Sequence, residues 1–582
     1  MNALEQAKQQ IIDQLQPLMP EGVTVAPIDL EQPPQRELGD LAFPCFSLAK
    51  SLQKAPPAIA AELAEKFAAT ELVAEAAPAG PYINFKFDRS KFSQAVLEDV
   101  AAGRTQQLNS SKAQQLIIEY GQPNTHKEVH VGHLRNFFLG LSVVRVLRAA
   151  GQSVIPVSYI GDVGAHVAKC LWAYKKFHAG ERPEAGSEGK FLGAIYTEAS
   201  QKIEENEDLK EEVAAVQRAL ESGDPEWTAL WQETRQWSLD EMNAIFSELG
   251  CDFERIYTES EVEGPGKELV QKMLADGLAK ESQGALVMDL EDEDLGIFLL
   301  LKSDGSSLYA TKELALAELK FEEYPQADTS IHVVDTRQSL YFQQFFATLK
   351  RLGFDKRLVH LAYDFVTLKE GAMSSRKGNV ITYAEFRDQL LAMAIEETGK
   401  RHADWSEEKT RQTAWQISEA AMKFAMLKQD NDRPITFDPQ EALAFEGFTG
   451  PYIQYAHARM CSILTKASVA AELASAPTQA SVAAELASAP SGQFTEQEFA
   501  LLRTVAKAPE VIAEAASKFR PSALAQYAFE LAQEASGFYR DVPVISAEQQ
   551  SDRERRLAIV QSAKQILERS LYLLGITAPT EM

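Results

Sequence analysis

The spacing of apolar and polar residues divides the chain into three regions. Residues 1–110 alternate amphipathic helical stretches with strand-like runs such as PYINFKF at 81–87. Residues 111–390 mix short apolar runs with helical ones, and an acidic, Trp-bearing helical stretch interrupts them at about 175–250. Residues 391–582 are almost wholly helical in pattern. These patterns predict an N-terminal α/β domain, a second α/β domain with a helical insertion, and a C-terminal all-α helical bundle.

The second region begins with the pattern of a βαβ unit. LIIEY (116–120) is typical of a buried parallel strand. NFFLGLSVVRVLRAAG (136–151) predicts a helix that ends at a glycine, and SVIPVSYIGD predicts the next strand. The intervening loop, QPNTHKEVHVGH, therefore leaves the carboxyl end of a strand, where open parallel sheets bind ligands. We expect a Rossmann-like fold here.

Composition limits the class of protein. The 582 residues are 45% hydrophobic and 24% charged, which is ordinary for a globular protein. The four cysteines lie far apart without a CxxC pair, which argues against a disulfide framework or a zinc ribbon. The N-terminus lacks the apolar core of a secretory signal, and no segment has the length of a transmembrane helix, so a cytoplasmic protein is expected. The net charge of −26 argues against a generic nucleic-acid coat protein but allows a local basic groove.

Two histidines, His130 and His133, flank Gly132 in the loop. Zinc would need further ligands, and no Cys/His cluster supplies them, so no protein-bound metal is expected. Either histidine alone could simply pack against the helix or cap it. The whole phrase favours phosphate, because Gly132 allows close approach, a helix start attracts anions, and imidazoles can donate hydrogen bonds. The chain has no GxxxxGK[ST] loop, which excludes a P-loop enzyme.

A second stretch, GAMSSRKGN (371–379), is a small basic loop that follows the predicted strand LVHLAYDFV. Alone it would most often be a surface turn. Together, HVGH and AMSSR resemble the HIGH and KMSKS motifs of class I aminoacyl-tRNA synthetases. The chain is similar to the arginyl-tRNA synthetase family nearly end to end, through Pro123–His133, LYATKELA, VVDTRQSLYFQQFFATLKRLG, FEGFTGPYIQYAHARMCSI and the ending LLGI…APTEM.

The resemblance implies a two-step reaction. Arginine attacks the α-phosphate of ATP, which enters as its Mg²⁺ complex, and arginyl-adenylate then passes arginine to the 3′ end of tRNA-Arg. In this family, activation generally needs the tRNA, and a monomer is usual. The resemblance assigns ATP contacts to Pro123, Asn124, His130, Gly132, His133, Met373 and Ser374. It assigns closure over pyrophosphate to Ser374, Ser375, Arg376 and Lys377.

The signature loop departs from the general motif. Its two lysines align with Ala372 and Ser375. Many arginyl enzymes that lack the second lysine carry another lysine just upstream of HVGH, and Lys127 stands there. We expect Lys127 to supply the missing positive charge; the alternative is a solvated loop lysine.

The arginine pocket follows from the resemblance as well. Its expected members are Glu119, Asn124, His130, Tyr309, Glu313 and Gln338. Glu313 replaces the usual aspartate, and it shares a helix face with Tyr309 at i, i+4. A guanidinium is best held by carboxylates, although an ordinary surface glutamate is the alternative at this position. GDVGAH (161–166) departs from the usual GDWGTQ, which leaves that wall of the site undefined.

The helical C-terminal region resembles the family's anticodon-binding domain. Tyr452, Tyr455 and Arg459 form one helical stripe that could stack on bases, and Met582 joins them by analogy. Such a stripe is more often core. The N-terminal domain would contact the tRNA elbow, and binding should be sensitive to salt. ASVAAELASAP occurs twice within 467–490, which indicates a duplicated surface insertion without a catalytic role.

Three other functions remain open at this point. The chain could be another class I synthetase, such as the cysteinyl or glutamyl type, although zinc ligands are missing. It could be a nucleotidyltransferase of the HIGH superfamily, which would not need the helical third. It could be a tRNA-binding paralogue that has lost activation, because Ser375 and Glu313 depart from the pattern. Amino-acid-dependent ATP–pyrophosphate exchange separates them.

Overall fold

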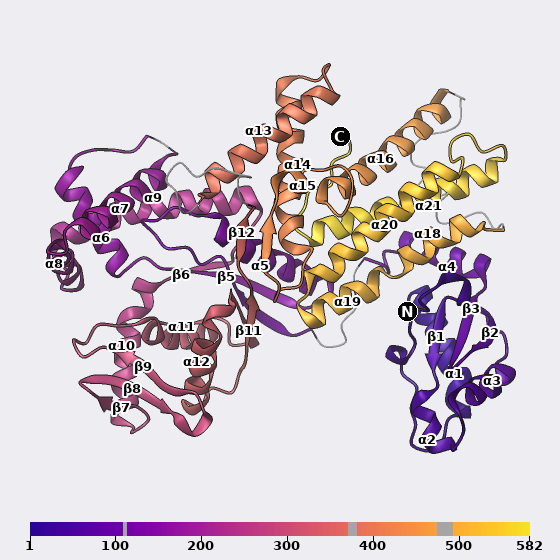
Figure 1. The fold of residues 1–582 in the computed structure, drawn as a ribbon, viewed down its shortest axis with the longest axis horizontal. Coiled ribbons are helices and arrows are strands. Elements are labelled where there is room, and N and C mark those ends of the chain that lie inside the picture. The colour runs from indigo at the N-terminus through magenta and orange to yellow at the C-terminus, as the bar shows by residue number, and fades with distance from the viewer. Residues whose placement is uncertain (107, 109–112, 185, 370–380, 474–492) are drawn as a thin grey trace.

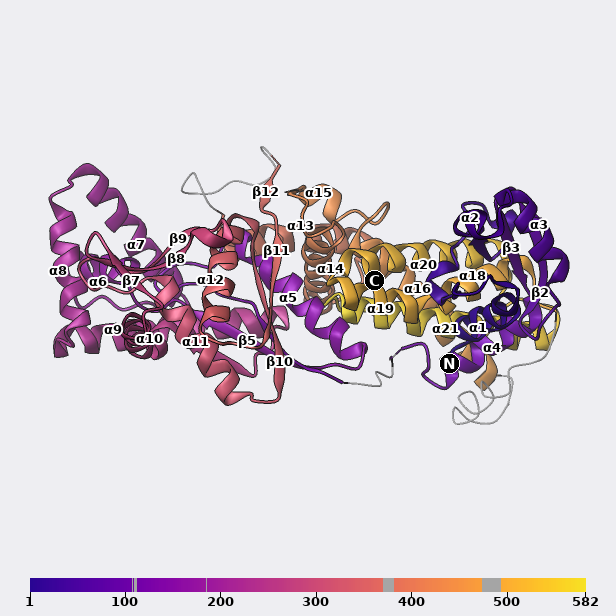
Figure 2. The ribbon, with the colours of Figure 1, turned by 90° about the horizontal axis from the view of Figure 1, so that it is seen from below.

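The computed structural model describes residues 1–106, 108, 113–184, 186–369, 381–473 and 493–582. The molecule is elongated (Figures 1 and 2). The N-terminal domain lies at one end and the helical insertion at the other, with the parallel sheet and the helical bundle between them. Within the described ranges, no helix combines the length and the apolar character that a membrane span requires.

The N-terminal domain is a three-stranded antiparallel sheet covered by helices. The strands are β1 (Leu41–Pro44), β2 (Val73–Ala79) and β3 (Tyr82–Phe87), in the order β1-β3-β2. The main helices are α1 (Ala3–Leu15), α3 (Pro56–Lys66) and α4 (Arg89–Ala101). Ile83 and Phe85 of β3 are fully buried, which accounts for the apolar residues that predicted a strand here. The α/β prediction for this region is confirmed.

The second predicted region is built on a five-stranded parallel sheet, in the order β11-β10-β4-β5-β6. The strands are β4 (Gln115–Glu119), β5 (Ser153–Ile160), β6 (Arg255–Thr258), β10 (Ala327–Asp335) and β11 (Arg357–Tyr363). The chain runs outward from β4 through β5 and β6, then returns to β10 on the other side of β4. The topological switch point therefore lies between β4 and β10, where Glu119 is paired in register with His332.

Both faces of this sheet are covered. Leu116 and Ile118 of β4 pack with α5 (Val131–Ala149), while Ile117 packs with α10 (Glu259–Ala275) and α11 (Tyr309–Glu323). A strand that is buried on both faces needs an unbroken apolar run, which is why LIIEY carries no polar alternation. The predicted Rossmann-like parallel sheet is confirmed.

Helix α5 begins earlier than the sequence indicated. Its first residue is Val131 rather than Asn136, so Gly132 and His133 lie in the first helical turn and His130 is the N-cap. The polar residues of HVGHLRN had masked the helical pattern. The helix ends as predicted, with Gly151 just beyond it at φ +81°.

The helical insertion packs around its own core. Its helices are α6 (Ala165–Phe177), α7 (Glu188–Glu205), α8 (Leu209–Glu221) and α9 (Pro225–Leu249). After β6 and α10 comes a separate antiparallel sheet of β7 (Lys280–Ser282), β8 (Ala285–Leu290) and β9 (Gly296–Leu301). Helix α12 (Ser339–Arg351) separates β10 from β11. A short parallel pair, β12 (Val366–Leu368) with β13 (Ile435–Phe437), leads to the bundle.

The C-terminal region is the predicted helical bundle. Its helices are α13 (Tyr383–Arg401), α14 (Glu407–Leu427), α15 (Pro439–Ala442), α16 (Gly450–Leu473), α18 (Glu496–Ala506), α19 (Ala508–Lys518), α20 (Pro521–Asp541) and α21 (Gln550–Leu573). The first residues of the duplicated string belong to α16, and 474–490 lie outside the described residues. The N-terminal domain docks on α18, where Arg503 Nη1 lies 2.7 Å from Asp40 Oδ1.

Candidate active site

The loop between β4 and α5 is anchored by His126, which the sequence did not single out. The imidazole is fully buried, with Nδ1 2.9 Å from Thr125 Oγ1 and Nε2 2.9 Å from Thr234 Oγ1. The His126 N–H donates to Ser238 Oγ at 3.0 Å. Its φ of +61° lies in the left-handed region, which is unfavourable for a residue with a Cβ and is held here by these contacts. The loop is thereby fixed to α9.

His130 and His133 face each other at the start of α5. Their rings stack with centroids 3.7 Å apart, and the His130 backbone N–H donates to His133 Nδ1 at 3.1 Å. A Cβ on Gly132 would lie 3.0 Å from the Cε1 and Nδ1 atoms of His130. The absence of a side chain at Gly132 therefore allows the His130 ring to occupy this position. Because Nδ1 of His133 is an acceptor, its neutral ring carries the proton on Nε2 and can donate to a ligand from there.

Both imidazoles are neutral at physiological pH. Burial lowers the pKa of His133 to about 3, with smaller contributions from His130 and the Lys127 ammonium. Burial and the same ammonium lower the pKa of His130. The rings therefore stabilise an anion by donating hydrogen bonds rather than by carrying charge, and Lys127 is the local positive charge.

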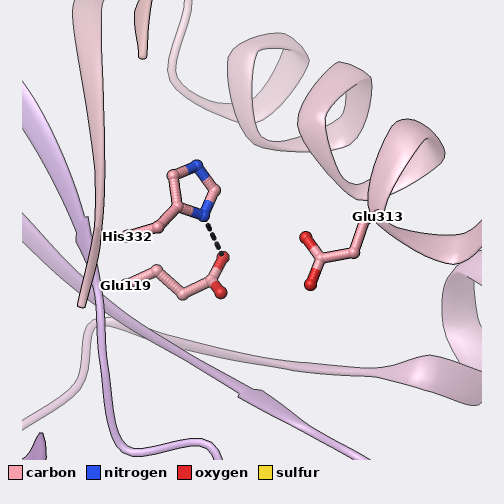
Figure 3. A group of neighbouring side chains, drawn as sticks. All are labelled: Glu119, Glu313 and His332. Carbon is pink, nitrogen blue, oxygen red and sulfur yellow. Dashed lines mark ion pairs between the residues drawn. The ribbon is translucent and has the colours of Figure 1, made fainter. Parts of the chain in front are cut away.

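A second cluster lies across the switch point of the sheet (Figure 3). Glu119 Oε2 lies 2.6 Å from Lys320 Nζ and 3.7 Å from His332 Nδ1, and all three side chains are buried. Burial opposes ionisation of Glu119, but Lys320 and His332 outweigh it and hold its pKa well below the usual range. Glu119 is thus ionised and already paired with a cation. The sequence did not single out Lys320. Its position seven residues after Glu313, on the same face of α11, is the pattern that indicates it.

Glu313 points toward this cluster without a partner of its own. It is buried, and its Oε2 has no hydrogen-bond partner among the described residues. Burial raises the pKa of Glu313 to about 8, and the nearby Glu119 adds to the shift. A carboxylate in this position is poised to accept hydrogen bonds from an incoming cation.

Other unpartnered polar atoms surround Glu313. The hydroxyls of Tyr159 and Tyr341 and Nδ1 of His332 are buried and have no hydrogen-bond partner among the described residues. Burial, and then the charge of Glu313, raise the pKa of both tyrosines, so their hydroxyls lie within electrostatic reach of that carboxylate. Unpaired polar groups are costly in a protein interior, and their convergence indicates a site that a polar ligand completes.

The remaining residues expected for an arginine pocket differ in their surroundings. Asn124 lies directly against Gly161. A Cβ added to Gly161 would collide with Oδ1 of Asn124 and would approach the carboxyl group of Glu259. Tyr309 is 59% exposed on the first turn of α11, and Glu259 and Glu313 add to the rise that burial causes in its pKa. Gln338 is exposed on the 3-10 turn that precedes α12.

The GDVGAH segment, left undefined by the sequence, has two roles in the structure. Asp162 is fully buried and accepts hydrogen bonds from Arg235 Nε at 2.6 Å and Ser260 N at 2.8 Å. His166 has a buried Nε2 without a hydrogen-bond partner among the described residues. Burial lowers the pKa of His166 to about 4, and Lys127 contributes, so this wall also faces that lysine.

One group of side chains in the described residues has the composition of a metal site: Glu119, Glu313 and His332. The Lys320 ammonium, 2.6 Å from Glu119 Oε2, places a positive charge where a metal ion would have to bind. That charge disfavours a divalent ion. A planar guanidinium, which spreads one charge over three nitrogens, is better suited to the remaining carboxylate.

The signature-loop residues lie outside the described residues; they are Met373, Ser374, Ser375, Arg376 and Lys377. The chain just beyond them is described. Val131 N–H donates to Ile381 O at 3.2 Å, and Tyr383 N–H donates to Val129 O at 2.7 Å. The segment that follows the loop, at Ile381 and Tyr383, is therefore attached to the turn that carries His130.

The segment just before β12 is also linked to α5. Arg135 is 2% exposed, and within the part of the chain that the structure describes its guanidinium donates to backbone carbonyls alone. One is Asp364 O, just before β12, and the others belong to Asp430, Asn431 and Arg433. The helix that presents the histidines thus fixes both the segment before β12 and the turn between α14 and β13.

The stripe on α16 divides between core and surface. Tyr452 packs on Phe529 with ring centroids 5.4 Å apart. Tyr455 and Arg459 are exposed and line a cavity of about 480 Å³ together with Met582. His402, Trp405 and Tyr539 are further aromatic walls of this cavity, which the sequence did not indicate. Three of the four residues expected to meet the anticodon therefore gather at one concave surface.

Three family models match the chain in order. The Arginyl tRNA synthetase N terminal domain covers residues 5–87, the tRNA synthetases class I (R), catalytic domain covers 94–438, and the DALR anticodon binding domain covers 453–582. The arginine–tRNA ligase of Bdellovibrio bacteriovorus is 38% identical over 563 residues, which cover 95% of this chain and 94% of that protein. Arginine–tRNA ligase 1 of Bacillus cereus is 34% identical, with 95% of each chain covered.

Solved structures agree with these relatives. The Thermus thermophilus arginyl-tRNA synthetase superposes with a TM-score of 0.80 at 29% identity, covering 99% of this chain and 100% of the other. The Plasmodium falciparum arginyl-tRNA synthetase has the same fold, with a TM-score of 0.79 at 18% identity and complete coverage of both chains. The sequence resemblance, the parallel sheet with its histidine turn, and these matches lead to one conclusion: the chain belongs to the arginyl-tRNA synthetase family of class I aminoacyl-tRNA synthetases.

Proposed function

We propose that this chain carries out its family's reaction, the ATP-dependent ligation of arginine to tRNA-Arg, and that Glu313 is the residue that selects the guanidinium. The observation that carries the proposal is the buried carboxylate of Glu313, unpartnered beside the hydroxyls of Tyr159 and Tyr341. A guanidinium can donate two parallel hydrogen bonds to this carboxylate and further ones to the hydroxyls. An apolar or neutral amino acid would leave them unpaired, which explains how arginine is chosen without an editing step.

Glu119 has a different part in this proposal. Its charge is matched by Lys320 at 2.6 Å, so it orders the floor of the pocket instead of neutralising the substrate. Tyr309, Asn124 and Gln338 complete the pocket around the less buried end of arginine, which carries the reacting carboxylate. Their placement toward the outside agrees with that end meeting ATP.

The triphosphate of ATP, bound as its Mg²⁺ complex, would lie at the start of α5 against His130, His133 and the backbone beside Pro123 and Gly132. Neutral imidazoles donate hydrogen bonds to phosphate oxygens as charge develops there. Lys127 supplies a positive charge, in place of the lysine that Ser375 replaces. Ser374, Ser375, Arg376 and Lys377, with Met373 against the nucleotide, would close over the pyrophosphate.

The tRNA would use two further parts of the chain. The concave surface at Tyr455, Arg459 and Met582 suits an unstacked anticodon base, with Tyr452 supporting the helix from beneath. The N-terminal domain would contact the elbow. We assign residues 1–110 to that domain, 111–390 to catalysis and 391–582 to stem and anticodon contacts, with the protein acting as a monomer in the cytoplasm.

The test is ATP–pyrophosphate exchange with purified protein. We expect exchange only when arginine and tRNA-Arg are both present, followed by formation of arginyl-tRNA. Exchange with another amino acid would contradict the assignment of Glu313, and no exchange under any condition would indicate a tRNA-binding protein that has lost activation.

A further inference from the structure

The ammonium of Lys127 packs over the aromatic ring of Tyr196, a residue of α7. Lys127 Nζ lies 4.9 Å from the ring centroid, within the range of a cation–π interaction. Lys127 belongs to the loop before His130, and Tyr196 belongs to the helical insertion, some seventy positions later in the chain. Neither motif of the active site includes Tyr196.

Helix α7 packs closely against the loop that contains Lys127, one helical turn before Tyr196. A Cβ on Gly193 would lie 2.5 Å from Cγ of Glu128, so glycine at this position lets the Glu128 side chain lie directly on the helix. Gly193 precedes Tyr196 by three residues, which puts both on the same face of α7. The residue beside Lys127 is therefore seated on the same helix face that presents the ring.

The contact keeps the charge of Lys127 available. Among the described residues, Lys127 forms no ion pair with a carboxylate, although the chain is strongly acidic. Its charge reaches the site, because it adds to the lowering that burial causes in the pKa of His130, His133 and His166. A carboxylate partner would cancel that charge, whereas an aromatic ring holds an ammonium and leaves it positive.

We propose that Tyr196 is a positioning residue for adenylate formation, which holds the Lys127 ammonium where the pyrophosphate leaves. The inference rests on the role proposed above for Lys127. Lysine has a flexible four-carbon stem, so a lysine on a loop must be held in place to stabilise a developing charge without reorganisation. The helical insertion thereby contributes directly to the active site.

The expected effect is on turnover. Tyr196→Leu should lower kcat of arginine- and tRNA-dependent ATP–pyrophosphate exchange by about tenfold, the range of a partly buried cation–π contact. The KM for arginine should change less than twofold, since the guanidinium pocket lies elsewhere. Tyr196→Phe keeps the ring face and should retain at least half of the wild-type kcat.

A double-mutant cycle shows whether Tyr196 acts through Lys127. Lys127→Ala should lower kcat by about 100-fold, and Tyr196→Leu should cause no further loss in that background. Tyr196→Leu should still lower kcat in a Lys169→Ala background, because Lys169 is the other cation near this ring, 5.2 Å from its centroid. Lys169→Ala alone is the matched control and should stay within twofold of wild type.

The outcomes separate this inference from the proposed function. If Lys127→Ala leaves kcat unchanged, the role of Lys127 fails, and the inference fails with it. If Lys127→Ala slows turnover but Tyr196→Leu does not, or if the two losses multiply independently, Tyr196 is not a positioning residue while the proposed function stands. Circular dichroism and thermal melting of Tyr196→Leu must match wild type; a folding loss that Tyr196→Phe shares would also overturn the inference.

Discussion

Lys320 and Glu119 form a buried ion pair, with Nζ and Oε2 2.6 Å apart and both side chains at most 2% exposed. The ammonium of Lys320 therefore neutralises the charge of Glu119 within the protein. Of the two carboxylates that face each other across the switch point, only Glu313 is left for a substrate (Figure 3). This division of roles between two acidic residues underlies the predictions for Glu313 and Lys320.

Glu313→Gln should weaken arginine binding strongly without lowering the stability of the protein. The substitution removes the uncommitted member of this pair of buried carboxylates and with it a charge-assisted contact to arginine, so kcat/KM for arginine should fall by about 100-fold, with KM for ATP nearly unchanged. The melting temperature of the variant should equal or exceed that of the wild-type protein, because the substitution removes a buried unpaired acid. Glu318→Gln, on an exposed part of the same helix, is the matched control. A KM for arginine within threefold of wild type would remove Glu313 from the pocket.

Arginine affinity should increase with pH. The pKa of Glu313 is raised to about 8, and the guanidinium needs the ionised form. Affinity measured by calorimetry should therefore rise about tenfold per pH unit from about pH 6 and level off above about pH 8, with about one proton released near pH 7. The slope should vanish in Glu313→Gln, and a flat profile in the wild-type protein would contradict the prediction.

The same shift has a consequence for the protein without arginine. In the unfolded chain Glu313 ionises near 4.5, whereas in the folded protein it ionises near 8. The unfolded state therefore binds fewer protons between these values. The contribution of Glu313 to folding stability should decrease as pH rises through this interval and stay constant above it.

Lys320→Met should destabilise the fold. The substitution leaves the buried Glu119 carboxylate without its cation, which costs about 3–5 kcal/mol of unfolding free energy in comparable cases. The double variant Glu119→Gln with Lys320→Met removes both charges and should recover most of that loss. Urea denaturation of the two proteins makes the comparison. Equal destabilisation in both would show that packing, rather than charge, accounts for the effect.

Gly132→Ala should separate activity from stability. The added methyl group would lie 3.0 Å from two atoms of the His130 ring, which must then shift from the position it holds against His133. We expect kcat to fall by about tenfold or more, as for a misplaced catalytic group. Alanine also favours the helix by up to about 1 kcal/mol, so the melting temperature should not drop. Gly399→Ala, in an open position of α13, should keep full activity.

Tyr455→Ala should raise the KM for tRNA and leave the KM for arginine and ATP unchanged. Stacking of one base on an aromatic ring contributes about 1–3 kcal/mol, which corresponds to a rise of about 5- to 150-fold. Tyr452→Ala is the informative comparison, because Tyr452 is half-buried and packs on Phe529 at the edge of the core. That variant should lose thermal stability instead. A normal KM for tRNA in Tyr455→Ala would remove this surface from the anticodon contact.

The sequence alone determined much of the fold and predicted where the candidate site lies. LIIEY requires burial on both faces, so it predicted a central parallel strand, and HVGH beyond its carboxyl end predicted phosphate chemistry there. The spacing of Tyr309 and Glu313 predicted that one helix presents both. These features depend on residues that are close in the chain, and local geometry is sufficient to interpret them.

Other features depend on residues that are far apart in the chain. The strand RIYT was not recognised, because four residues with two charged or polar members carry little pattern. ALVMDL and IFLLLK are two of the short apolar runs within residues 111–390, but only folding assigned them, as β8 and β9, to a separate antiparallel sheet. His126 gave no signal, since its partners Thr234 and Ser238 are more than a hundred positions away.

The chemistry of the pocket was decided by tertiary structure in the same way. The sequence assigned Glu119 and Glu313 to one pocket, but it could not show that Lys320 neutralises the first and leaves the second unpaired. Strand pairing of β4 with β10 and the packing of α11 over them create that difference. Ionisation depends on burial and on neighbouring charges, and both are set only when distant segments meet.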